Sequence, residues 1–103
     1  MRCCRTLVAT LCLTAAQPVC ASDYEIVIKD MRFGAAPNQL KVGDTLTWRN
    51  ADFLSHTATA RNGAFDLKLP PGAKAKVTLQ KAGAIAVFCR YHPDMTSQLL
   101  VVK

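Results

Sequence analysis

Three residues that can bind soft metal ions recur at intervals of three near the carboxyl end of the sequence. Cys89, His92 and Met95 share this short segment, and His56 is the only other histidine in the chain. A thiolate, two imidazoles and a thioether form a ligand set that suits copper. Two histidines and a cysteine in a plane around the ion, with a weakly bound methionine, describe a type 1 or blue copper site. The four residues are therefore candidate copper ligands, and the chemistry that they predict is one-electron transfer.

Each of these residues, taken alone, has a more common role. A methionine often fills a gap in a core, and a single cysteine is often a small buried apolar residue. Cys89 with His92 could be a nucleophile and its base, but no glycine-rich elbow or oxyanion-hole motif accompanies them. A zinc site rarely recruits a methionine. The joint presence of all four favours copper over these alternatives and over a metal-free structural domain.

The first 21 residues have the pattern of a secretory signal peptide. Arg2 and Arg5 form a basic start, residues 6–16 are apolar without a charge, and small residues precede Ser22. The apolar run is well short of the roughly 20 residues that cross a bilayer. A buried N-terminal element is the alternative. We predict cleavage after residue 21, a mature domain of residues 22–103, a periplasmic location and no membrane span.

Removal of the signal peptide would leave too few cysteines for a disulfide within the chain. Four of the five cysteines lie within residues 1–21, so the 82 residues that remain contain only Cys89. A disulfide framework within one chain is thereby excluded. An apolar content of 50% and a charged content of 19% are typical of a globular chain. The length allows one domain with a modest core.

The net charge does not indicate a nucleic-acid partner. It is +6 for the whole chain and +4 for residues 22–103. Export removes the opportunity to meet nucleic acid, and the aromatic residues do not alternate with the basic ones. The basic residues of the second half of the chain are instead expected on a solvated face. They include Lys68, Lys74, Lys76 and Lys81.

The elements that must position the candidate ligands are expected to be strands. Apolar and polar residues alternate in short runs, and no segment has a convincing helical period. The runs are residues 26–33, 40–42, 46–48, 56–60, 65–69, 77–79, 84–88 and 99–102. They predict a small all-β, Greek-key β-sandwich of seven to eight antiparallel strands. The continuous apolar run 84–88 predicts a strand buried on both faces. Loops at one end of such a sandwich would bring the ligands together.

The sequence resembles the cupredoxins, the plastocyanin/azurin family, over residues 22–103. The similarity includes residues 40–52, which precede His56, and the loop from Cys89 to Met95. The compact Cys-x-x-His-x-x-Met spacing is most similar to the amicyanin branch. This resemblance implies one copper ion that alternates between Cu(II) and Cu(I), with His56, Cys89, His92 and Met95 as its ligands. It also implies a mobile electron carrier that is not an enzyme. Its partners would be larger redox proteins of the dehydrogenase or cytochrome type, and the chain would be a monomer.

The sequence departs from the family pattern around the ligands. Ser55 and Thr57 flank the first histidine, where family members often have proline and asparagine. Arg90, Tyr91 and Asp94 stand in a loop that usually contains small or apolar residues.

The resemblance places electron exit at the solvent-facing edge of His92. Tyr91, Pro93, Leu54 and Ala36 are candidates for a surrounding contact patch. The same ligands could also serve a copper-binding module that stores or delivers copper without redox cycling, so this alternative stays open.

Overall fold

The computed structural model describes residues 21–103, which form strands joined by loops. The predicted signal peptide lies outside these residues except for Ala21. The strands are β1 (Asp23–Lys29), β2 (Arg32–Phe33), β3 (Leu40–Lys41), β4 (Thr45–Asn50), β5 (His56–Ala60), β6 (Asp66–Leu69), β7 (Lys74–Thr78), β8 (Gly83–Phe88) and β9 (Thr96–Val102). Seven of them have four or more residues, and β2 and β3 have two each. Within residues 21–103, no helix is long and apolar enough to cross a membrane.

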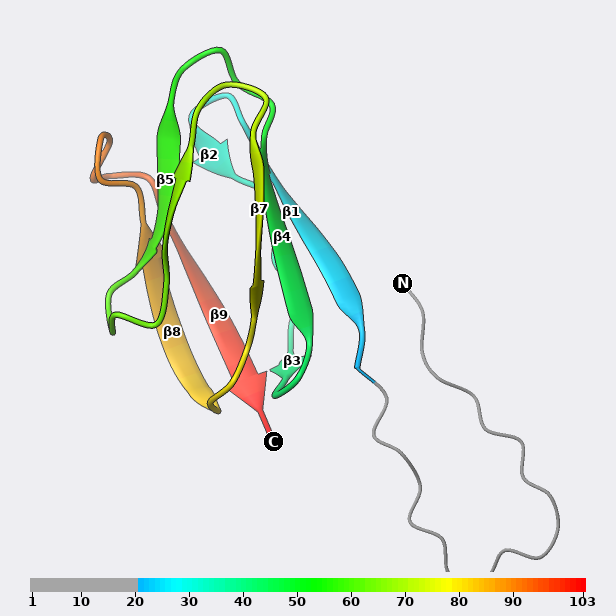
Figure 1. Cartoon of the computed structure of the whole chain (residues 1–103). Helices are drawn as coiled ribbons and strands as arrows, with labels where there is room; N and C mark the ends of the chain where they lie inside the picture. Colours follow the sequence, from blue (N-terminus) through cyan, green and yellow to red (C-terminus); the bar gives the residue numbers. More distant parts are fainter. Residues whose placement is uncertain (1–20) are drawn as a thin grey trace, which may run out of the picture.

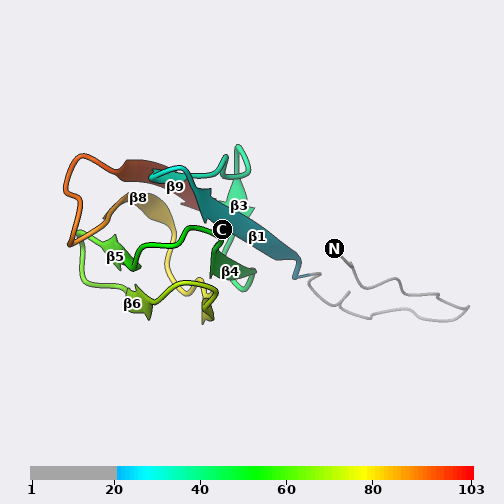
Figure 2. The same ribbon diagram turned by 90° about the horizontal axis from the view of Figure 1, so that it is seen from above.

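The strands form two sheets that face each other (Figures 1 and 2). The four-stranded sheet has the order β2-β1-β4-β7, and the five-stranded sheet has the order β3-β9-β8-β5-β6. The predicted all-β sandwich is confirmed. The expectation of purely antiparallel pairing is wrong, because β1 pairs with β4 and β3 pairs with β9 in parallel. The chain leaves the first sheet for β3 and then returns to it, so β4 runs in the same direction as β1.

Alternating side chains of β1 and β4 form the centre of the core. Ile26, Ile28, Leu46 and Trp48 are all at most 1% exposed. Each strand places every second residue on the inner face, which is the period that the sequence shows. The Trp48 ring packs edge-on against Phe33, with ring centroids 5.5 Å apart. This core fixes β4, and the loop after β4 leads directly to His56.

Two sequence expectations about individual strands are wrong. Residues 26–33 are not one segment but the hairpin of β1 and β2, which turns at Asp30 and Met31 with φ angles of 55° and 60°. Strand β8 is not buried on both faces, since Ala84 is exposed and Ala86 is half-buried. Ala84 and Ala86 count as apolar in the sequence, but they lie on the solvent face of β8 and not in the core.

The expectation of a solvated basic face is confirmed. The lysines at positions 68, 74, 76 and 81 are all exposed. On β7, Thr78 is exposed as well and continues the same face.

The strand ends bring the predicted ligands to one end of the sandwich. His56 is the first residue of β5, and Cys89 directly follows the last residue of β8. Strands β5 and β8 are antiparallel neighbours, with Thr59 opposite Phe88, so the start of β5 lies beside the end of β8. The loop from Cys89 to Met95 then leads into β9. Residues 33 positions apart are thereby placed side by side.

Candidate metal centre

His56, Cys89 and His92 form a cluster that could hold a metal ion. Their ligand atoms all lie within 4.8 Å of one another. The Sγ of Cys89 is 3.8 Å from Nδ1 of His56 and 3.7 Å from Nδ1 of His92. His56 and Cys89 are fully buried, whereas His92 is half-buried. The structure therefore brings together three of the four residues predicted as ligands, with the Nδ1 atoms of both rings facing the sulfur.

The spacing of these donor atoms fits a single bound metal ion. A metal–nitrogen bond of about 2.0 Å and a metal–sulfur bond of about 2.3 Å separate nitrogen from sulfur by about 3.5–3.7 Å at angles between tetrahedral and trigonal. The observed distances of 3.7 and 3.8 Å are close to this range. A trigonal His₂Cys set is the geometry of blue copper.

Backbone hydrogen bonds shape the loop that contains Cys89. The N–H of His92 donates to the carbonyl of Cys89 at 3.3 Å, and the N–H of Met95 donates to the carbonyl of His92 at 2.9 Å. The N–H of Cys89 donates to the carbonyl of Met95 at 3.1 Å and closes the loop. Met95 is only 5% exposed and belongs to the core cluster that includes Cys89. The loop thus returns the backbone of Met95 to that of Cys89, and the role of Met95 as axial ligand stays a prediction.

The sulfur of Cys89 receives a backbone hydrogen bond from the neighbouring strand. The N–H of Thr57 points at Sγ across 3.4 Å, in a fully buried environment. This contact holds the sulfur at the position where it faces both histidines.

A ring of hydrogen bonds connects the cysteine loop to β5 and β6. The hydroxyl of Thr57 accepts from the N–H of Arg90 at 2.9 Å and lies 2.9 Å from the hydroxyl of Thr59. Thr59 donates to Asp66, and the Arg90 guanidinium donates to the same carboxylate with two nitrogens at 3.2 Å. The hydrogen bond from Arg90, followed by that from Thr59, lowers the pKa of Asp66. Thr57 and Arg90, two departures from the family pattern, therefore act together to hold the loop.

Replacing Thr57 by valine should destabilise the protein by about 1–3 kcal/mol. Valine has nearly the same shape, but it leaves the N–H of Arg90 without its acceptor in a part-buried position. Urea unfolding of the metal-free protein measures the difference. Thr57→Ser keeps the hydroxyl and is the matched control. Equal stabilities of the valine and serine variants would show that the ring of hydrogen bonds does not hold the loop.

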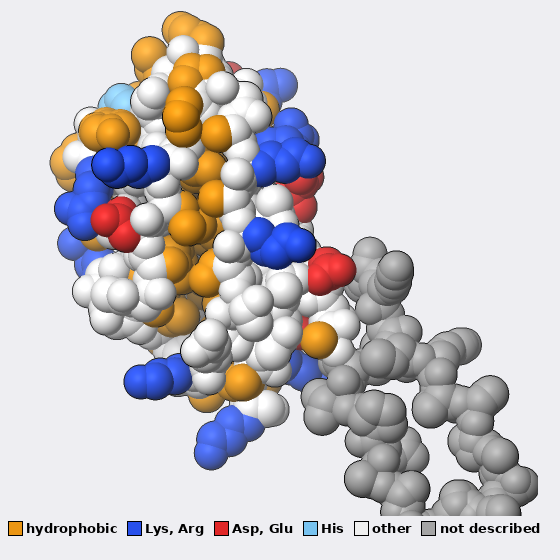
Figure 3. Space-filling view, in the orientation of Figure 1, with side chains coloured by type: hydrophobic (Ala, Val, Ile, Leu, Met, Phe, Trp, Pro, Cys, Tyr) orange, Lys and Arg blue, Asp and Glu red, His pale blue; other side chains and the backbone are white. Residues whose placement is uncertain are grey.

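The outer edge of the cluster lies among exposed apolar side chains. Figure 3 shows a histidine side chain at the surface beside apolar side chains, whereas His56 is fully buried. Tyr91 is 54% exposed, Leu54 is 40% exposed and Pro93 is exposed, as expected of the predicted patch.

The other members of that patch differ from the sequence expectation. Ala36 is half-buried and packs against the core, so it offers little contact surface. Phe53, which precedes Leu54, is 85% exposed and is the most exposed of the large apolar residues. Its position in the loop before His56 is the signal that could have identified it.

Asp52 is a second site residue that the sequence does not distinguish from other loop carboxylates. Its Oδ2 lies 2.8 Å from Nε2 of His56, on the side of the ring away from Cys89. The pKa of Asp52 is lowered, first by the hydrogen bond from the Met31 backbone and then by the His56 side chain. Only the fold reveals the contact between Met31 and Asp52, because Met31 lies in the β1–β2 turn, which is distant in sequence.

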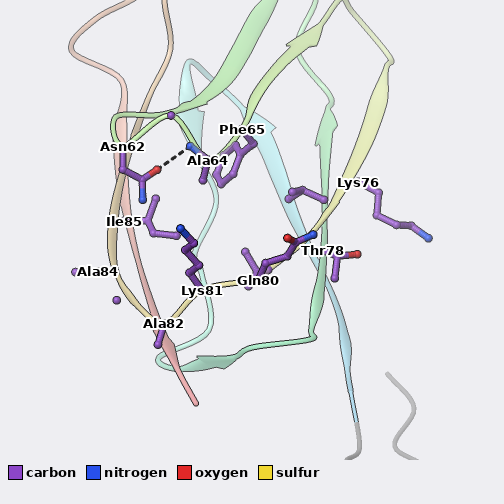
Figure 4. Close-up of a pocket in the computed structure, with 14 residues that line it drawn as sticks. Asn62, Ala64, Phe65, Lys76, Thr78, Gln80, Lys81, Ala82, Ala84 and Ile85 are labelled. Atoms are coloured by element: carbon purple, nitrogen blue, oxygen red, sulfur yellow. Dashed lines mark hydrogen bonds between the residues drawn. The ribbon is translucent and has the colours of Figure 1, made fainter.

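A groove lies at the other end of β5 and β8. The turn at Asn62 and the connection from Gln80 to Ala84 line it, and in Figure 4 the side chain of Lys76 points away from it. Asn62 uses its side-chain oxygen to accept from the N–H of Ala64 at 2.9 Å. The lining residues include no histidine, cysteine or carboxylate, so the groove does not compete with the cluster as a metal site.

Comparison with known proteins agrees with this geometry. The model of the cupredoxin-like domain family matches residues 3–102. Amicyanin from Paracoccus versutus is 26% identical over an alignment of 100 positions, which covers 86% of this chain and 76% of amicyanin.

Solved structures show the same fold. The Cu(I) form of an amicyanin variant at pH 4 is 28% identical with a TM-score of 0.64, over 75% of this chain and 79% of that one. A purple cupredoxin from Nitrosopumilus maritimus has a TM-score of 0.60 at 21% identity, over 75% of this chain and 97% of that one. The family match spans nearly the whole sequence, and the fold and the His-Cys-His cluster agree with it. The chain belongs to the cupredoxin-like family.

Proposed function

We propose that the protein is a type 1 copper protein that carries single electrons between larger redox proteins in the periplasm. His56, Cys89 and His92 would hold one copper ion, and Met95 would be a weak axial ligand. The observation that supports this most directly is the convergence of one sulfur and two Nδ1 atoms within reach of a single ion. Similarity to amicyanin supports the same function.

A bound copper ion would supply the redox chemistry, Cu(II) against Cu(I), and the chain would supply a fixed set of ligands. His56 and Cys89 are fully buried at the ends of two paired strands, so the surrounding side chains restrain both of them. The hydrogen bond from Thr57 to the sulfur restrains Cys89 further. Ligands that stay in place in both oxidation states need little reorganisation when an electron arrives or leaves. Such a site suits transfer, and the chain is proposed to be a carrier and not an enzyme.

The surface around His92 supports a transient contact with a partner. His92 is half-buried, whereas the ligands beside it are covered, so its ring edge is the shortest route to solvent. Exposed Phe53, Leu54 and Tyr91 lie in the two loops next to the ligands, and they would exclude water from an interface. A partner protein with a shallow apolar surface would bring its own redox centre close to this edge.

A visible absorption spectrum tests the proposal. The protein is expressed from the full chain, purified, and measured before and after one equivalent of Cu(II), and again after ascorbate. We expect an intense blue band that bleaches on reduction and returns on oxidation. A weak, pale spectrum would contradict the proposal, because Cys89 would then not be bound as a thiolate. Loss of Cu(I) to an acceptor protein without reversible voltammetry would instead indicate copper storage or delivery.

A further inference from the structure

One carboxylate connects the buried histidine of the cluster to a distant turn. The side chain of Asp52 is 8% exposed, and its Oδ2 lies 2.8 Å from Nε2 of the fully buried His56. Its Oδ1 accepts from the N–H of Asp30 at 2.9 Å, and Oδ2 also accepts from the N–H of Met31 at 3.0 Å. Three donors from two loops therefore converge on one side chain.

The contact with Asp52 fixes which nitrogen of His56 has the proton. A carboxylate only accepts hydrogen bonds, so the neighbouring Nε2 must donate. In the neutral ring, Nδ1 is then free of a proton and presents its lone pair. Nδ1 is the atom that faces Sγ of Cys89 across 3.8 Å. Asp52 thus selects the tautomer that a metal ion at this position requires.

The other two hydrogen bonds hold a turn whose backbone conformation is unfavourable. Asp30 and Met31 both have positive φ angles, 55° and 60°. Aspartate tolerates this left-handed conformation, whereas it is unfavourable for methionine. Figure 1 shows the β1–β2 turn at the same end of the sandwich as the start of β5, because β1 and β4 are parallel. Asp52 gains a fixed position from the turn, and the turn gains two acceptors from Asp52.

The negative charge of Asp52 favours metal binding by His56, as its hydrogen bond does. The two oxygens of Asp52 face three nitrogens, the backbone N–H groups of Asp30 and Met31 and Nε2 of His56, which is the pattern of a carboxylate that only accepts. An anion on the far side of the imidazole makes Nδ1 a stronger electron-pair donor to a metal ion. It also stabilises a doubly charged ion more than a singly charged one. The carboxylate would therefore stabilise the oxidised form of the copper site more than the reduced form.

We propose that Asp52 is a positioning residue that anchors the β1–β2 turn to His56, fixes the Nδ1-free tautomer and lowers the reduction potential of the copper site. The effect on the potential rests on the proposed copper function, whereas the effect on the tautomer does not.

The first experiment uses the metal-free protein, expressed from the full chain. Nitrogen-15 NMR at pH 8 reports the tautomer of each histidine. We expect His56 to be protonated at Nε2 in the native protein and to become a mixture of tautomers in Asp52→Asn. Asparagine keeps the shape but offers one acceptor oxygen to three donors. A native His56 protonated at Nδ1 would overturn the proposal without any variant.

The second experiment measures copper affinity and voltammetry of the loaded protein. Loss of such a partner typically lowers metal affinity about 10–100-fold, and we expect the loss in Asp52→Asn to fall mainly on Cu(II). A tenfold larger loss for Cu(II) than for Cu(I) raises the potential by about 59 mV. Asp52→Glu retains the charge and should restore most of the potential. Asp94→Asn removes an exposed carboxylate from the ligand loop and is the control for charge alone.

The outcomes separate the two proposals. An unchanged tautomer and an unchanged potential in Asp52→Asn would overturn the role of Asp52 even in a blue protein. An equal rise in potential in Asp94→Asn would show that any nearby carboxylate has this effect, and it would overturn the claim that Asp52 sets the potential through its contact with His56. If the protein takes up no copper, the proposed function fails, and the tautomer of His56 still tests the anchor.

Discussion

Replacing Cys89 by serine should abolish the intense blue absorption of the copper-loaded protein. The colour of a type 1 site comes from charge transfer between a thiolate sulfur and Cu(II), and a serine hydroxyl cannot provide it. Cys89 is fully buried and is the only free cysteine among residues 21–103. No other thiol of the folded domain can take its place. The visible spectrum of the variant with one equivalent of Cu(II) checks this, and the expected intensity of the blue band is zero.

Two controls keep this result specific to the sulfur. The metal-free variant should retain the circular dichroism of the native protein, since serine has nearly the shape of cysteine and its hydroxyl faces the N–H of Thr57. Met95→Leu alters a buried residue of the same loop, keeps the thiolate and should stay blue. A Cys89→Ser protein that remains intensely blue would remove the basis of the proposed copper site.

The cluster of ligands is predictable from the sequence because its chemistry is local. Cys89 and His92 lie in one loop whose ends are set by two apolar runs, and the loop closes through its own backbone hydrogen bonds. His56 is distant in sequence, but it starts a strand that must pair within a small sandwich. Residue type and the positions of the strand ends therefore suffice to predict that these three side chains come together.

The surroundings of the cluster are not predictable in this way, because they depend on non-local pairing. Asp52 meets Asp30 and Met31 across more than 20 positions only because β1 and β4 run parallel, which the sequence pattern does not indicate. The positive φ angles at Asp30 and Met31 are not predictable from the sequence, because neither residue is a glycine. The partners of a carboxylate depend on the register of strands that are distant in sequence.

Thr57 shows a further limit of prediction from residue type. In sequence it is a departure from the family pattern next to a ligand. In the structure its hydroxyl accepts from Arg90, a second departure, and the ring of hydrogen bonds closes through Asp66. A single sequence does not show that two residues 33 positions apart belong to one ring of hydrogen bonds. The signal peptide of residues 1–21 stays a prediction, since it lies almost entirely outside the described residues.

Copper should raise the melting temperature of the protein by about 16 °C or more. A ligand that binds only the native state stabilises it by RT ln(1 + [L]/Kd), which is about 4.1 kcal/mol at 1,000 times Kd. In a domain of 60–100 residues, each kcal/mol shifts the melting temperature by about 4–8 °C. The donors come from the start of β5 and from the loop after β8, so they converge only in the folded chain. An unfolded chain binds the ion more weakly because it must first bring these segments together.

Thermal unfolding with and without one equivalent of copper measures this shift, with circular dichroism as the probe. Cys89→Ser is the matched control, because it loses the thiolate while retaining both imidazoles, and copper should shift its melting temperature much less. Zinc offers the native ligands a closed-shell ion without redox chemistry. A smaller but positive shift with zinc would show that convergence of the donors, and not oxidation of the thiol, stabilises the fold. If the metal-free and copper-loaded proteins melt at the same temperature, the cluster does not bind copper in the native state, whatever colour the solution has.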